Sequence, residues 1–361
     1  MTGESLAVRD DLKGLHPYGA PQIDVPVRLN TNENPYPPSP ALQRAIADAV
    51  AQAAATLNRY PDRDATDLRK DLADYLGHGL TARHTWAANG ANEVIQQLLQ
   101  AFGGPGRRAL GFDPGYSMHP LIAQVTCTGW VSVDRDEGFG LDPDYAARAV
   151  EQAQPSLVFL TSPNNPTGTS APIDVIEAIC AAAPGLVVID EAYAEFAREG
   201  TPSALTLLPR YPGLVVTRTM SKAFAMAGAR VGYLAAAPEI VEKLLLVRLP
   251  YHLSAVTQAV ARAALALAAE PLATVTTLRS ERDGVVRWLR ARGLRVADSD
   301  ANFVLFGTFE SRRDVWQRLV DRGVLVREVG PPRWLRVSVG TPQEMAAFRA
   351  ALGEILSEVL T

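Results

Sequence analysis

The segment GLVVIDEAY, residues 185–193, indicates the architecture of the whole chain. Its apolar run is continuous rather than alternating, and the run LVFL at 157–160 has the same character. Continuous runs of this length are typical of strands covered on both faces, as in a mostly parallel sheet. Asp190 ends the first run, and a carboxylate at the end of a buried strand is costly unless it is paired. The segment therefore also predicts a partner for Asp190, either a protonated ring nitrogen of a ligand or an arginine.

Working outward from this segment, short apolar strands alternate with helices. Strands are predicted at 85–88, 108–112, 130–133, 156–161, 186–190, 214–218 and 231–235. Helices are predicted at 91–102, 117–125, 142–152 and 172–182. This alternation predicts an α/β fold whose mostly parallel, mixed sheet is covered by helices on both faces. Ligands of such sheets bind at the carboxyl ends of the strands.

The flanking regions predict a second, smaller unit. Ser39-Pro40 begins a helix, since Ser is a good N-cap and Pro suits the first helical position. A helical region at 237–292 is interrupted at Leu249-Pro250, because Pro removes a helix donor. Short strands and helices follow and form a smaller α+β domain that the N-terminal arm completes. The predicted division is an arm at 1–45 that belongs to the small domain, a large domain at 46–250 and a small C-terminal domain at 251–361.

Composition excludes several classes of function. The chain has 361 residues, a net charge of −4 and no basic block, which argues against nucleic acid or an anionic membrane as a partner. The N-terminus has no apolar signal region, and we expect a cytoplasmic protein. The five histidines show no metal-ligand spacing, so no metal is predicted. Cys127 and Cys180 have no C-x-x-C spacing and are predicted to be a buried, reduced pair.

Lys222 is the most informative single residue, because the chain has four lysines and 31 arginines. It lies in TMSKAF, residues 219–224, directly after a predicted strand. Arginine carries a positive charge equally well, but it does not readily lose its proton to attack a carbonyl. A lysine amine with a lowered pKa does so and forms a Schiff base. The alternative is an ordinary surface charge, and the neighbouring motifs argue against it.

Three further motifs predict groups that hold a ligand. Gly90, Ala91 and Asn92 open a helix, where free N–H groups and the helix dipole attract an anion, although simple helix capping explains them as well. Ser221 and Arg230 suit a phosphate. Within SPNNPTG, residues 162–168, Asn165 can donate to a phenolate-like oxygen, and turn chemistry is the alternative. Tyr193 can donate to the same ligand, and Tyr116 can stack on a flat ring or pack in the core.

These groups together form a complementary site for pyridoxal 5′-phosphate. They supply a phosphate cradle, an acid for a pyridine nitrogen, donors for a ring oxygen, a stacking ring and an amine nucleophile. Each piece alone is a weak signal. Their occurrence in one chain, each near the end of a predicted strand, makes a chance arrangement very improbable.

The same motifs make the chain resemble the class I/II pyridoxal-phosphate aminotransferases of fold-type I. Within that family it is similar to the histidinol-phosphate aminotransferases, and the similarity covers nearly the whole chain from Leu29 onward. The most specific markers are LNTNENPYPPSP (29–40), RYPD (59–62), GANE (90–93), SPNNPTG (162–168), IDEAY (189–193), TMSKAFAMAGARVGY (219–233) and LRVSVGT (335–341). The first two favour this subfamily over the aspartate or alanine aminotransferases.

The resemblance implies a role for each matching residue. The implied catalytic residues are Lys222 as the Schiff-base lysine, Asp190 as the partner of the pyridine nitrogen, and Tyr193. The implied cofactor-binding residues are Gly90, Ala91, Asn92, Tyr116, Asn165, Asp190, Tyr193, Thr219, Ser221, Lys222, Arg230 and, from the partner subunit of a homodimer, Tyr60. The implied substrate-binding residues are Asn32, Tyr18, Arg327 and Arg336. The segment 328–335 between these two arginines is shorter than in many relatives and adds Arg333 as a further anion ligand to consider.

The resemblance also implies the reaction, a ping-pong transfer of an amino group between L-histidinol phosphate and 2-oxoglutarate in histidine biosynthesis. Three alternatives share the site: an aromatic amino-acid aminotransferase, a decarboxylase of the same fold, and a non-catalytic cofactor-binding regulator. The last usually adds a basic DNA-binding domain, and no such stretch precedes residue 85. The residues that contact the imidazole ring are open, with Tyr18, Tyr251 and His252 as guesses.

Overall fold

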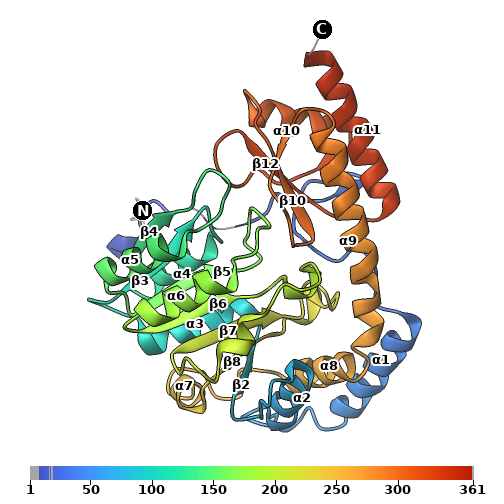
Figure 1. The fold of residues 1–361 in the computed structure, drawn as a ribbon. Helices are drawn as coiled ribbons and strands as arrows, with labels where there is room; N and C mark the ends of the chain where they lie inside the picture. The colour runs from blue at the N-terminus through green and yellow to red at the C-terminus, as the bar shows by residue number, and fades with distance from the viewer. Residues whose placement is uncertain (1–7, 16, 18, 360–361) are drawn as a thin grey trace, which may run out of the picture.

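A seven-stranded mixed sheet forms the centre of the large lobe of the protein (Figure 1). The structure is a computed structural model that describes residues 8–15, 17 and 19–359. The strand order is β2-β8-β7-β6-β5-β3-β4. The strands are β2 (Thr85–Ala88), β3 (Arg108–Asp113), β4 (Gly129–Asp134), β5 (Leu157–Thr161), β6 (Leu186–Asp190), β7 (Leu214–Thr219) and β8 (Gly232–Ala236). Only β8 runs against its neighbours among them, so the predicted mostly parallel sheet is confirmed.

Helices cover both faces of this sheet, as the continuous apolar runs predict. One face packs against α3 (Ala91–Phe102), α4 (Met118–Val125) and α7 (Pro238–Leu244). The other packs against α2 (Thr66–Leu76), α5 (Pro143–Ala153), α6 (Ile173–Ala182) and α8 (Ala255–Ala266). Every residue of β5 and β6 is buried. Each buried Val, Leu or Ile side chain contributes roughly 1.5–3 kcal/mol, which explains why these two strands need no polar face.

The smaller lobe is built on an antiparallel sheet in the order β12-β10-β9. Its strands are β9 (Arg295–Val296), β10 (Phe303–Gly307) and β12 (Trp334–Ser338), and its helices are α10 (Arg312–Asp321) and α11 (Pro342–Val359). The N-terminal arm adds a strand beside this lobe, because β1 (Val27–Arg28) pairs with β11 (Val324–Leu325) in parallel. The arm therefore crosses from the small lobe to the sheet of the large lobe.

The helical region after β8 differs from its prediction. Its first helix, α7, ends at Leu244, and a second break at residues 267–268 separates α8 from α9 (Ala269–Arg290). Pro271, in the first turn of α9, marks this second break, because its ring has no N–H to donate and would clash with the carbonyl of Leu267 in a continuous helix. The two helices meet there at 69°, because α8 packs against α1 (Pro40–Ala54) and α2, whereas α9 crosses to the small lobe. The division at 250/251 stays a prediction, and this packing favours a boundary later in the chain, within α9.

Capping explains where several helices begin. The Ser39 side chain accepts a hydrogen bond from the backbone N–H of Leu42 at 3.1 Å, with Pro40 in the first helical position, as predicted. Asp142, Ser254 and Ser311 cap α5, α8 and α10 in the same way. Such caps satisfy N–H groups that the helix itself leaves without partners.

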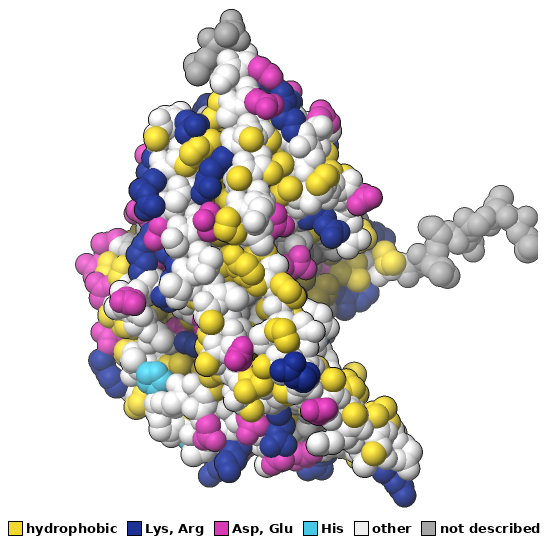
Figure 2. Space-filling view, turned by 90° about the vertical axis from the view of Figure 1, so that its right-hand side faces the viewer, with side chains coloured by type: hydrophobic (Ala, Val, Ile, Leu, Met, Phe, Trp, Pro, Cys, Tyr) yellow, Lys and Arg dark blue, Asp and Glu magenta, His cyan; other side chains and the backbone are white. Residues whose placement is uncertain are grey.

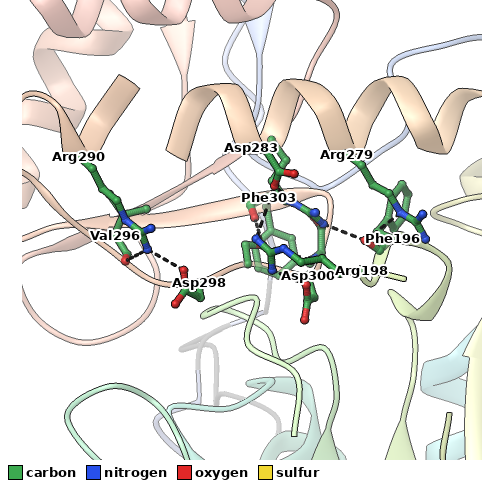
Figure 3. A network of polar contacts seen from close by, with 12 residues as sticks. Phe196, Arg198, Arg279, Asp283, Arg290, Val296, Asp298, Asp300 and Phe303 are labelled. Atoms are coloured by element: carbon green, nitrogen blue, oxygen red, sulfur yellow. Dashed lines mark hydrogen bonds and ion pairs between the residues drawn. The ribbon is translucent and has the colours of Figure 1, made fainter. Parts of the chain in front are cut away.

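A network of arginines fastens α9 to the segment that follows β6 (Figure 3). Arg279 donates to the backbone oxygens of Glu195 and Phe196, and Arg282 donates to the Phe196 oxygen at 2.8 Å. Arg198, from the same segment, forms ion pairs with Asp283 and Asp300. The long helix thus holds residues 195–198 in place, a few residues beyond the end of β6.

The surface of the protein corrects one prediction. The prediction for the cysteines is wrong in part: both are free thiols, but Cys127 is exposed at a left-handed position (φ 57°) just after α4. Among the described helices, none is by itself long and apolar enough to cross a membrane. The bent pair of α8 and α9 is long and apolar enough only when the two helices are taken together, by length and composition alone. On the face shown in Figure 2, basic and acidic side chains are interspersed, with no continuous block of one sign.

Candidate active site

A cavity of about 360 Å³ opens at the carboxyl ends of β5, β6 and β7, where the two lobes and the N-terminal arm meet. The predicted cofactor and substrate residues that line it are Asn32, Ala91, Asn92, Tyr116, Asn165, Asp190, Tyr193, Thr219, Ser221, Lys222, Arg230, Arg327 and Arg336. Gly90 lies directly behind it, beside Arg230. The chain therefore brings together residues that lie as many as 306 positions apart, at the edge of the sheet where ligands of such folds bind.

Lys222 lies in the turn after β7, half-buried at the wall of the cavity. Its Nζ donates to the backbone oxygen of Thr31 in the N-terminal arm at 3.1 Å. Burial, together with the positive charges of Arg336 and Arg230, lowers the pKa of Lys222 to about 8, while the negative charge of Glu33 opposes this shift. The amine is thus neutral in a larger share of molecules near neutral pH than an ordinary lysine, which is the condition for nucleophilic attack.

Asp190 ends β6 inside the cavity and is 3% exposed. Its Oδ2 accepts a hydrogen bond from the ring Nε2 of His119 at 3.2 Å, and its Oδ1 accepts from the Ala192 backbone N–H. The His119 ring packs on Phe159 and meets Tyr116 edge to face. Arginine as the structural partner of Asp190 is therefore wrong, because a buried histidine from α4 takes that place.

Tyr193 and Asn165 meet at one point of the wall. The Tyr193 hydroxyl accepts hydrogen bonds from the side-chain amides of Asn32 at 3.1 Å and Asn165 at 3.5 Å. The Asn165 Oδ1 accepts from Arg336 Nη1 at 2.6 Å. The neighbouring Asn164 behaves differently: it is fully buried and donates to Pro114 and Thr167, so turn chemistry accounts for it.

The predicted phosphate cradle lies at the N-terminus of α3. Arg230 has a left-handed backbone (φ 56°), and its Nη1 lies 3.3 Å from the Ser221 hydroxyl. A Cβ added to Gly90 would lie 2.4 Å from Arg230 Nη2, and one added to Gly232 would lie 2.1 Å from the Ala91 nitrogen. The two glycines thus let a guanidinium and helix N–H groups converge on one spot. That donor set fits a phosphate, which helix N-termini bind readily.

The substrate side of the cavity carries two arginines. Arg336, on β12, donates through Nη2 to the Asn30 backbone oxygen at 3.0 Å and lies over the Phe303 ring. Arg327 donates to the Gly19 backbone oxygen, and its backbone pairs with that of Arg336 in both directions. Asn32 forms hydrogen bonds with Ser338 and Asn302 of the small lobe. Both lobes and the arm therefore contribute to this wall.

Two predicted residues lie elsewhere. Arg333 donates to the Phe309 backbone oxygen and does not line the cavity. Tyr60 is 79% exposed, and its ring stacks on that of Tyr251 with 4.3 Å between centroids. Tyr18 lies outside the described residues. Within one subunit, Tyr60 is thus a surface residue rather than a wall of this cavity.

Sequence reasoning missed His119, Thr31 and Glu33 as residues of the site. His119 follows Tyr116 by three residues, which is the only local signal that it lies near the same site. Thr31 and Glu33 lie within the marker LNTNENP, but the hydrogen bond from Lys222 to Thr31 and the effect of the Glu33 charge on Lys222 depend on how the arm crosses the sheet. The sequence pattern contained these residues without indicating their neighbours.

Comparison with known proteins places the chain in a family. The model of the family described as aminotransferase class I and II matches residues 24–352. The histidinol-phosphate aminotransferase of Thermobifida fusca is 67% identical, over 97% of this chain and 95% of its own. That of Frankia casuarinae is 62% identical, over 98% and 91%. The crystal structure of a histidinol-phosphate aminotransferase from Sinorhizobium meliloti, in complex with pyridoxal-5′-phosphate, superposes with a TM-score of 0.83 at 27% identity and covers 93% of this chain and 92% of that one.

Proposed function

The chain belongs to the aminotransferase class I and II family, and from that premise we propose that it transfers the amino group of L-histidinol phosphate to 2-oxoglutarate. The products are imidazole acetol phosphate and glutamate. The observation that carries this proposal is the meeting of Lys222, Asp190 and Arg336 around one cavity, in a chain whose relatives carry the name of that activity. The expected location is the cytoplasm.

The residues present fit pyridoxal 5′-phosphate. The N–H groups at Ala91 and Asn92, with Ser221 and Arg230, would hold its phosphate, and Tyr116 would lie against its ring. Asp190 would face the ring nitrogen, while Asn165 and Tyr193 would face the ring oxygen. When bound, the cofactor supplies an electron sink for the negative charge that develops at the reacting carbon of the substrate.

Lys222 acts as the proton carrier of the reaction. With its pKa lowered to about 8, Nζ accepts a proton from the reacting carbon and later returns one, which is efficient when the pKa lies near the working pH. Its contact with the Thr31 backbone oxygen orients the amine toward the cavity. Asp190, held by His119 and the Ala192 N–H, keeps its carboxylate in one orientation for a positively charged nitrogen.

The two substrates pose a charge problem that arginine solves. Histidinol phosphate presents a phosphate, whereas glutamate presents two carboxylates. A planar guanidinium binds either group through two parallel hydrogen bonds. Arg336 and Arg327, whose backbones pair with each other, are in place to do so from one wall of the cavity.

A homodimer with shared sites accounts for the outer surface near Tyr60. Tyr60, Leu57, Leu246 and Leu249 are all exposed large side chains, from 57% to 79%, and Tyr251 stacks on Tyr60. Apolar groups gathered in this way favour an interface over a water-facing surface. In such a dimer Tyr60 of each subunit would reach the phosphate cradle of the other.

One assay tests the function. Purified protein with pyridoxal phosphate and 2-oxoglutarate is supplied with histidinol phosphate or with phenylalanine, and the glutamate formed is measured. Faster turnover of histidinol phosphate is expected. Preference for phenylalanine would identify an aromatic amino-acid aminotransferase, and release of CO₂ in place of glutamate would identify a decarboxylase.

A second measurement tests the site independently of turnover. Borohydride reduction of the protein with its cofactor should attach the label to one peptide, and mass mapping should place it on Lys222. A label on another lysine, or none, would overturn the assignment of Lys222.

A further inference from the structure

Glu33 is a carboxylate of the cavity that the proposed reaction does not yet use. Among the residues that the structure describes, Glu33 and Asp190 are the two carboxylates lining the cavity, against four cationic side chains (Lys222, Arg230, Arg327 and Arg336). Asp190 is engaged by His119 and faces the cofactor side. Glu33 comes from the N-terminal arm, on the substrate side, and is exposed.

The backbone around Glu33 is held firmly, although its side chain is at the surface. The backbone oxygen of Thr31 accepts a hydrogen bond from the Lys222 amine. Asn32 forms hydrogen bonds with Tyr193, Ser338 and Asn302. Asn32 also has a left-handed backbone (φ 56°), which turns the chain between two contacts. The Glu33 Cα is thus fixed beside the cavity, while its carboxylate can move between partners.

Charge complementarity restricts what this carboxylate can bind. A carboxylate repels the phosphate of one substrate and both carboxylates of 2-oxoglutarate. It accepts hydrogen bonds from N–H groups, most strongly from charged ones. Apart from the reacting amine, the imidazole ring of histidinol phosphate is the one substrate group with an N–H, and it becomes cationic near its usual pKa of about 6.5.

We propose that the Glu33 carboxylate accepts the imidazole N–H of the amino donor and thereby determines specificity for imidazole-bearing substrates. This inference rests on the proposed function and adds the residue that recognises the ring. The other end of the donor, its phosphate, belongs to Arg336 and Arg327, which line the same substrate side of the cavity. The two ends of the substrate therefore meet groups of opposite charge.

The same geometry explains how 2-oxoglutarate enters a cavity that contains Glu33. The Thr31 hydroxyl donates to Glu33 Oε2 at 2.8 Å and offers the carboxylate a second partner on the arm. Because Glu33 is exposed, it stays hydrated in that position and its repulsion of an anion is screened. Glu33 is then engaged in one half-reaction and held on Thr31 in the other.

The test compares binding by the holoenzyme of two ligands that differ only in the ring, with glutamate as a third ligand. Histidinol phosphate, phenylalaninol phosphate and glutamate are titrated while the cofactor absorbance is followed, for wild type, Glu33→Gln and Glu33→Asp. Asp24→Asn serves as the matched control, because it removes one exposed carboxylate from the same arm outside the cavity. Each titration is repeated at pH 6 and pH 8.5.

Glu33→Gln should weaken the binding of histidinol phosphate about tenfold at pH 6, and by less at pH 8.5, where the imidazole ring is neutral. In the same variant, the affinities for phenylalaninol phosphate and glutamate should change by less than about twofold. Glu33→Asp should retain part of the preference for histidinol phosphate over phenylalaninol phosphate. Asp24→Asn should bind all three ligands as the wild type does. Equal weakening of histidinol phosphate and phenylalaninol phosphate would overturn the proposal, since Glu33 would then only support the arm. A wild type that does not transaminate histidinol phosphate at all would overturn the proposed function first.

Discussion

Two consecutive carboxylates, Asp190 and Glu191, serve two different regions of the molecule. Asp190 faces the cavity, where His119 and the Ala192 N–H hold it. Glu191 points the other way, into a buried ion cluster that we define as Tyr75, Glu191, Glu195, Ser203 and Arg218. Successive side chains of a strand point to opposite faces, so one position at the end of β6 separates a reactive group from a structural one.

The buried ion cluster pairs its charges within itself. Arg218 donates to Glu191 Oε2 at 2.7 Å and lies 3.5 Å from Glu195, while Ser203 also donates to Glu191. Burial raises the pKa of Glu195, an effect that Arg218 opposes, and Tyr75 donates to its carboxylate at 3.2 Å. On the cavity side, Arg336 instead donates two of its hydrogen bonds to uncharged oxygens, those of Asn165 and Asn30. The difference indicates that charges in the cluster stabilise the fold, whereas those at the cavity are placed to meet a ligand.

The largest effect that would sharpen this comparison is expected from Lys222→Ala. Loss of the amine removes both the nucleophile and the proton carrier, so kcat should fall by at least about 10³-fold with little change in the unfolding transition. Steady-state assays and thermal unfolding measure the two quantities. Lys243→Ala, at an exposed position on α7, is the control and should keep wild-type activity. Appreciable turnover by Lys222→Ala would contradict the role given to the cavity side.

Arg218→Met should produce the opposite pattern. It leaves Glu191 and Glu195 buried without their cation, and breaking a buried pair costs about 3–5 kcal/mol in the free energy of unfolding. Urea unfolding of the protein measures this loss, and Arg336→Met provides the comparison with a smaller expected loss. A change below about 1 kcal/mol for Arg218→Met would show that the cluster is not structural in this sense.

Arg336→Ala should raise the barrier of both half-reactions by about 3 kcal/mol, because phosphate and carboxylate substrates use the same guanidinium. Single-turnover absorbance changes follow each half-reaction separately. The dual role of Arg336 is wrong if only the histidinol-phosphate half-reaction slows.

The smallest expected effect concerns pH. Burial lowers the pKa of Lys222 to about 8 in the folded protein, against about 10.4 when unfolded. Between these values the unfolded chain binds more protons, so this residue makes stability rise with pH, by at most about 1.4 kcal/mol per pH unit. The difference in free energy of unfolding between wild type and Lys222→Met, both without cofactor, should show this rise from pH 8 to 10. A flat difference would mean that Lys222 is not desolvated.

Sequence reasoning predicted the elements of the large lobe well, for a local reason. Continuous apolar runs placed β5 and β6, and the Ser39-Pro40 pair placed the start of α1, because burial and capping depend on near neighbours. The break between α8 and α9 was missed although Pro271 marks it in the sequence, and the packing of α8 against α1 and α2 sets the direction of the bend. Cys127 was misplaced because its exposure follows from the turn that ends α4.

The residue types that carry the chemistry were readable along the chain: an amine after β7, a carboxylate at the end of β6, and glycines where backbone must approach a phosphate. Which groups touch them was decided only by the folded structure. The partner of Asp190 is His119, 71 residues earlier, and the partner of Lys222 is Thr31, 191 residues earlier. Such pairings depend on how α4 and the N-terminal arm pack across the sheet. Packing is a property of the whole chain, whereas the identity of a reactive group belongs to one position.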